Sequence, residues 1–115
     1  MKKLVYSPDY AEKMRGLKKY LDLQFGVEIR KKVIKSIGNR VRSLREHEKL
    51  GVSVRDMYGV DSDCLVIFAQ RNYVFYRIES DSIYIVNIYN EREDFMMDLF
   101  GIHTTSEETE DYWGE

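Results

Sequence analysis

The sequence contains few of the residues that cross-link small proteins or hold metal ions. The chain has one cysteine, Cys64, and two histidines. A single cysteine excludes an internal disulfide and a cysteine-based zinc site. No apolar run approaches the roughly 20 residues of a transmembrane helix. The first residues, 1–6, carry charges but lack the apolar segment of a signal peptide. These absences predict a cytoplasmic protein without a metal, a cofactor or a membrane partner.

Length and composition predict one folded domain. The chain has 115 residues, of which 43% are hydrophobic and 33% charged, so disordered and fibrous classes are excluded. A chain of this length can bury a core large enough to be stable without cross-links. We expect the domain to span residues 1–103. Residues 104–115, with five acids and no base, are expected to form an acidic, mobile tail.

The small net charge of −2 conceals an uneven distribution. Residues 10–50 carry twelve lysines and arginines against five acids, whereas residues 51–103 carry four against nine. A basic half suits nucleic acid or an acidic protein partner, but it also suits a solvated helix surface, and both interpretations stay open. The acidic tail is predicted to lie near the bases of the second helix, which are Arg30, Lys31, Lys32, Lys35, Arg40, Arg42 and Arg45.

The first half of the chain predicts a short strand followed by two helices. Residues 2–6 alternate like a strand, and Ser7-Pro8 is a typical helix start, with a capping hydroxyl and a proline at the first helical position. Gly26 separates this helix from a second one over about 27–48, which Gly51 is expected to end. The apolar stripe of the first helix consists of Tyr10, Met14, Leu17 and Leu21.

The second half changes to the period of two that is typical of strands. Four strands are predicted, at 52–58, 64–70, 73–79 and 83–89. Asn90 is predicted to cap a last helix over 91–100. The order β-α-α-β-β-β-β-α predicts an α+β fold of two layers, in which a helical hairpin packs on an antiparallel sheet whose other face is partly open.

In this order the chain resembles a known family. The residues that carry the likeness are Gly51–Met57, Asn72–Ile78 and Ile83–Phe95, with Leu99-Phe100-Gly101 behind them. They resemble the RelE/ParE toxins of type II toxin–antitoxin systems over residues 2–101. The resemblance implies a small bacterial growth inhibitor of the kind linked to plasmid stabilisation, which a cognate antitoxin protein binds and neutralises.

The resemblance leaves three functions open. RelE-like members cleave mRNA on the ribosome, whereas ParE-like members poison DNA gyrase. Metal-free RNA cleavage needs groups that stabilise phosphate charge and move protons. At the positions where RelE-like enzymes carry such groups, this chain has Ala69, Val74 and Phe95. A ParE-like toxin that binds a macromolecule, not a small-molecule substrate, is therefore favoured. The alternatives are a ribosome-dependent endoribonuclease and a non-toxic module that only forms complexes.

The resemblance directs attention to three arginines and two aromatic residues. If the chain is an endoribonuclease, Arg55, Arg77 and Arg92 are the candidate catalytic residues, because arginine binds phosphate. The same arginines, together with Tyr89 and Phe95, are candidates for binding the target or the antitoxin. Each arginine also has a structural alternative. Arg92 has acidic neighbours to pair with, Arg77 lies in an apolar strand, and Arg55 is expected on the strand face opposite to that of Asp56.

Overall fold

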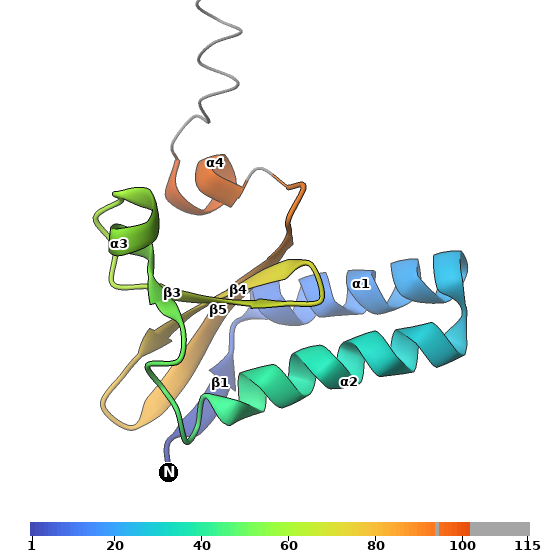
Figure 1. Ribbon diagram of the computed structural model, residues 1–115, viewed down its shortest axis with the longest axis horizontal. Helices are drawn as coiled ribbons and strands as arrows, with labels where there is room; N and C mark the ends of the chain where they lie inside the picture. The colour runs from blue at the N-terminus through green and yellow to red at the C-terminus, as the bar shows by residue number, and fades with distance from the viewer. Residues whose placement is uncertain (94, 102–115) are drawn as a thin grey trace, which may run out of the picture.

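The computed structural model describes residues 1–93 and 95–101, and Figure 1 shows two long helices on one face of a sheet and two short helices beyond it. The predicted tail at 104–115 lies outside the described residues. The elements in chain order are β1 (Lys3–Tyr6), α1 (Pro8–Phe25), α2 (Val27–Ser43), β2 (Val52–Ser53), α3 (Val54–Tyr58), β3 (Leu65–Ala69), β4 (Asn72–Ile78), β5 (Ser82–Asn90) and α4 (Phe95–Phe100). The α+β fold with a helical hairpin on a sheet is confirmed.

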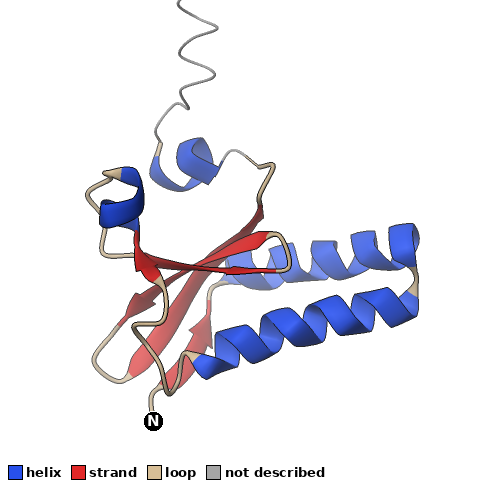
Figure 2. Cartoon of the chain, viewed as in Figure 1, coloured by secondary structure: helices blue, strands red, loops and turns tan. Residues whose placement is uncertain are grey.

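The five strands form one sheet in the order β1-β5-β4-β3-β2. The strands β2 to β5 pair antiparallel, as their tight connections require. β1 pairs parallel with β5, so the sheet is mixed and not purely antiparallel. Because two helices connect β1 to the next strand, the connection allows β1 to run either parallel or antiparallel to its neighbour. Figure 2 shows β1 at the edge of the sheet. Among the described residues, no helix has the length and apolar character to cross a membrane.

Ser7 begins α1 and also fixes that helix to the sheet. Its hydroxyl oxygen accepts a hydrogen bond from the Tyr10 N–H at 2.9 Å and donates one to the Val86 carbonyl at 2.5 Å. The Ser7 N–H donates to the carbonyl of Ile85 on β5. The predicted helix start is confirmed, and because Ser7 is buried, its hydroxyl satisfies groups that water cannot reach.

Replacement of Ser7 with alanine is expected to lower the free energy of unfolding by about 2–4 kcal/mol, because it removes an N-cap and the bond to the partly buried Val86 carbonyl. The matched control is Ser53→Ala, which removes the N-cap of α3, where an exposed bond of 3.4 Å joins the Ser53 hydroxyl to the Asp56 N–H. Urea titration should show a loss below about 1 kcal/mol for this control. Equal losses in the two variants would contradict the anchoring role of Ser7.

The main core lies between the helical hairpin and the sheet. Tyr10 of the predicted stripe is buried there, together with Ile37, Val41 and Leu44, and Leu21 is buried outside this cluster. Burial raises the pKa of the Tyr10 hydroxyl to about 12. The second helix ends earlier than predicted, at Ser43, because no apolar residue continues its stripe after Leu44 and the chain turns towards the sheet.

The strand predicted at 52–58 is wrong beyond its second residue. Only Val52–Ser53 pair in the sheet, and Val54–Tyr58 form α3. The Ser53 hydroxyl caps this short helix, and Gly59, with a φ of 70°, closes it in the left-handed conformation. The period-two pattern covers only residues 52–54, and the apolar residues Val54, Met57 and Tyr58 have helical spacing. Val54 is buried in the second core.

The last helix is also shorter than the predicted 91–100. Asn90 does not cap it but ends β5, and α4 begins at Phe95. The Asn90 side chain accepts a bond from the Arg92 N–H at 3.1 Å, and the Asn90 N–H donates to the Glu93 carboxylate at 2.9 Å. The capping chemistry read from the sequence therefore closes a turn over residues 91–93 instead of starting a helix.

A second core covers part of the sheet face opposite the long helices. Phe75 of β4 and Tyr89 of β5 point towards it, and Phe95 of α4 packs against both rings at 5.2 and 6.2 Å between centroids. Cys64 is buried in the same cluster, and burial raises the pKa of its thiol. The predicted open face is thus partly closed by α3 and α4, as Figure 1 shows.

Candidate protein-binding groove

A groove of about 1170 Å³ runs between the helical hairpin and the end of the sheet. The hairpin extends well beyond the sheet, on the right in Figure 1, so the inner sides of α1 and α2 are only partly covered. The β3–β4 turn and the turn after β5 form the opposite wall. Residues from Asp9 to Phe25 of α1 line the groove, a distance of about 24 Å at the helical rise per residue.

The distal half of the groove is apolar and exposed. Tyr20, Phe25 and Ile29 line it with exposed fractions of 55%, 58% and 43%. Leu23, which is 76% exposed, lies near them at the end of the hairpin but does not line the groove. Large apolar side chains gathered around a turn are unusual on the surface of a monomer, and they are typical of a site that binds another protein.

The proximal half of the groove is polar and rigid. Arg71 lies in the β3–β4 turn, and its carbonyl accepts a hydrogen bond from the Glu91 N–H at 2.9 Å. Its guanidinium lies 3.4 Å from the Glu91 carboxylate. Lys13 of α1 pairs with Glu93 at 2.5 Å and covers the ring of Tyr89. These contacts join α1 to both turns, so this wall is held in place without a partner.

The β3–β4 turn differs from the prediction by one residue. It consists of Gln70 and Arg71, both with positive φ, of 50° and 64°, and Asn72 belongs to β4. Two consecutive positive φ values match the twist of a hairpin turn. Gln70 donates from its side chain to the Ser36 hydroxyl of α2 at 3.0 Å, so this contact connects the turn to the long helix.

Arg92 is the one predicted arginine that lines the groove. It is exposed in the turn between β5 and α4. The alternative pairing with Glu91 is not observed, since Glu91 pairs with Arg71, and Asp94 lies outside the described residues. Among the ion pairs of the described residues none includes Arg92, so its guanidinium can contact a ligand in the groove.

Arg77 and Arg55 lie elsewhere. Arg77 is half-buried on the sheet face opposite the long helices, where it stacks on the ring of Tyr84 at 4.9 Å. Arg77 lies five residues along β4 from Asn72, the residue of this strand that lines the groove, which corresponds to about 17 Å along the strand. Arg55 lies in α3 and pairs with Asp61, so the expectation of opposite strand faces for Arg55 and Asp56 is wrong. The structure therefore does not bring the three arginines together.

Tyr89 and Phe95 are buried and do not line the groove. The Tyr89 hydroxyl donates to Asp98 at 2.6 Å and accepts from the Asn87 amide at 2.9 Å. Burial, followed by the bond to Asp98, raises the pKa of Tyr89. Both side chains are covered, so neither offers a free surface to a partner.

The sequence predicted no binding role for Lys13, Phe25 or Ile29, although all three line the groove, and Arg71 lines it as well. One signal was available for the apolar pair. Leu23, Phe25 and Val27 surround the hairpin glycine, where polar residues are usual. The positions of Lys13 and Arg71 carry no such signal, because only the tertiary fold brings them to one groove.

Comparisons with known proteins agree with this architecture. Residues 4–95 match the family model of the ParE toxin of the type II toxin–antitoxin system parDE. The chain is also similar to a solved structure described as the chromosomal ParDE TA system from P. aeruginosa, with 16% identity and a TM-score of 0.66. That likeness covers 78% of this chain and 96% of the other, and it shows a shared fold. Among curated proteins, none matches the chain significantly. The family match over most of the chain shows that it belongs to the ParE toxins of type II toxin–antitoxin systems.

Proposed function

We propose that this chain is the growth-inhibiting toxin of its module, that it acts in the cytoplasm by binding a macromolecular target, and that a cognate antitoxin neutralises it. DNA gyrase is the first candidate target, on the strength of the ParE family match. The observation that carries the antitoxin part of the proposal is the groove, which combines a polar wall with exposed apolar side chains. Such a surface suits a protein segment better than a small substrate.

The side chains of the groove favour binding over RNA cleavage. General acid–base catalysis needs a group that exchanges protons near neutral pH. The Tyr89 hydroxyl is held between Asp98 and Asn87, and its pKa is raised. Arg71 and Arg92 remain charged and are poor proton donors. No histidine lines the groove among the described residues.

The shape of the groove indicates what kind of antitoxin segment it accepts. Its length of about 24 Å along α1 matches an amphipathic helix of about 16 residues. The apolar face of such a helix would cover Phe25 and Ile29. The charged residues that line the groove comprise five acids and three bases, with Asp9 and Glu12 on the α1 side. We therefore expect lysine or arginine in the antitoxin segment at the end that meets these acids.

Phe25→Asp is expected to leave the toxin active but to abolish its neutralisation by the antitoxin. In the complex, the new carboxylate would be buried against the apolar face of the antitoxin helix, which opposes docking. Phe25 is exposed in the free toxin, so the substitution leaves the fold intact. The measurement is growth after induction, alone and with the neighbouring antitoxin gene. Leu23→Asp is the matched control, because it introduces the same charge on the same hairpin outside the groove, and cells carrying it should be rescued. Equal rescue of both variants would contradict docking in the groove.

The target is tested separately in the same cells. Poisoned gyrase should produce double-strand breaks and an SOS response with intact transcripts. Primer extension that maps cuts in mRNA at the ribosomal A site would instead support the endoribonuclease alternative. Normal growth after induction of a folded chain without the antitoxin would support a non-toxic complex-forming module and overturn the proposal.

A further inference from the structure

The sheet ends in an edge that is only half covered. β2 contributes two residues, which pair with Val66 and Leu65, so Ile67–Ala69 have no strand partner on that side in the described part of the chain. Arg40 of α2 donates to the Phe68 carbonyl at 3.2 Å, as expected for a carbonyl that points out of the sheet. An open strand edge invites pairing with another segment, and proteins usually cover it.

Beside this edge lies an apolar surface, here named the edge patch. It consists of Leu50, Val52, Met57 and Phe68, which are 42–47% exposed. All four line a hollow of about 190 Å³, together with Tyr73 and Arg40. The hollow and the antitoxin groove share no lining residue, and the four side chains of the patch are exposed in the described part of the chain.

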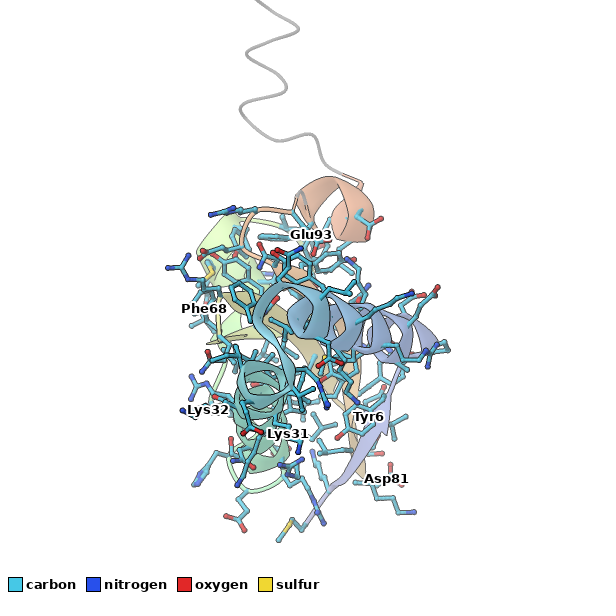
Figure 3. All side chains as sticks on the ribbon, turned by 90° about the vertical axis from the view of Figure 1, so that its right-hand side faces the viewer. Tyr6, Lys31, Lys32, Phe68, Asp81 and Glu93 are labelled. Carbon is cyan, nitrogen blue, oxygen red and sulfur yellow. The ribbon has the colours of Figure 1, made fainter. Side chains whose placement is uncertain are left out.

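A single basic side chain of the described residues lines the hollow of the edge patch. Arg40 is the one charged residue that lines the hollow within the described chain. Lys32, Ser36 and Arg40 are spaced four residues apart, so they form one row on α2. Arg40 bonds to Phe68 and Ser36 bonds to Gln70, so the row runs from the β3 edge to the β3–β4 turn, with Lys32 one helical turn beyond Ser36. Figure 3 shows Lys32 on the same side of the molecule as Phe68. The site therefore suits a segment that is both anionic and aromatic.

The chain itself contains such a segment. Residues 107–111 include four acids, and Tyr112 and Trp113 follow directly. The described structure ends at Gly101, behind α4, and Phe95 of α4 contacts the ring of Tyr58 in α3 at 5.5 Å. Met57 of the edge patch is the neighbour of Tyr58. The twelve residues from 102 to 113 can span up to about 40 Å when extended.

We propose that residues 107–113 dock on the edge patch of their own chain, with an aromatic side chain in the hollow and the acids beside Lys32 and Arg40. The docked segment shields the open edge of β3 from pairing with other chains. Tethering raises its effective concentration to the millimolar range, so weak contacts suffice. The docking does not depend on the proposed toxin function, because the antitoxin groove is a different surface.

The single tryptophan of the chain, Trp113, reports this docking directly. In the full chain, its fluorescence is expected to be blue-shifted and protected from acrylamide relative to a free peptide of residues 102–115. Lys32→Glu should reduce the docked-to-free ratio about tenfold, the change that about 1.4 kcal/mol of lost interaction produces. The effect should also weaken with added salt.

Lys31→Glu is the matched control, since it makes the same charge change one position away, on another side of α2, and it should leave Trp113 protected. Phe68→Asp is a second test that removes the apolar contact, with circular dichroism to verify the fold. A Trp113 signal equal to that of the free peptide would overturn the proposal. Equal effects of the two lysine variants would also overturn it, and so would protection that grows with protein concentration, because that indicates docking between two copies.

Discussion

Phe95→Ala is expected to lower the free energy of unfolding by about 3–5 kcal/mol, the usual range for a buried phenylalanine truncated to alanine. The ring is 9% exposed and contacts Tyr58, Tyr73, Phe75 and Tyr89 from three other elements. Its removal leaves a cavity between α3, α4 and the sheet. Urea denaturation followed by circular dichroism measures the loss.

Phe100→Ala provides the control for this substitution. Phe100 lies in the same helix but is only half-buried, and its ring contact with Phe75 is longer, at 6.1 Å. Truncation of Phe100 should lower the free energy of unfolding clearly less, because this side chain buries less apolar surface when the protein folds. If Phe100→Ala destabilised the protein as much as Phe95→Ala, the central role of Phe95 in the second core would be refuted.

Gly51→Ala is expected to destabilise the protein by about 2–4 kcal/mol, through a steric clash and the loss of a hydrogen bond. An added Cβ would lie 2.8 Å from the Val66 carbonyl and 2.8 Å from the Tyr76 hydroxyl. The fully buried Tyr76 accepts a bond from the Gly51 N–H at 2.9 Å and donates one to the Glu48 carbonyl at 2.7 Å. Neither neighbour can move freely, since one is sheet backbone and the other is core.

Gly16→Ala in α1 is the control for this substitution, because it adds the same methyl group at a glycine with free space around it. No atom lies within 4 Å of the added Cβ, and alanine favours a helix over glycine by about 1 kcal/mol. Thermal melts should therefore show a higher midpoint for Gly16→Ala and a lower one for Gly51→Ala. A neutral effect of Gly51→Ala would show that the segment from Glu48 to Gly51 relaxes without cost.

The sequence predicted the parts of the fold that short-range chemistry controls. Ser7-Pro8 begins a helix because a hydroxyl and a missing N–H act within one turn, and the spacing of Tyr10 and Leu21 identifies the buried side of that helix. The strands β3, β4 and β5 were found to within one or two residues. Only residues 52–54 of the predicted strand alternate, whereas Val54, Met57 and Tyr58 are spaced three and four residues apart, as in a helix that the Ser53 cap begins.

What the sequence alone determined is thus the fold class, the order of the main elements and, through the residues that resemble a family, membership of the RelE/ParE toxins. Only the tertiary structure decided that β1 joins the sheet parallel to β5, since the direction of a strand connected through two helices has no local signal. The groove was likewise decided in three dimensions. Arg71 and Arg92 meet there from two turns 21 residues apart, and Lys13 joins them from α1, while Arg55 and Arg77 are held elsewhere by a short helix and by the alternation of β4. A binding surface depends on which elements pack together, and that is a property of the whole chain.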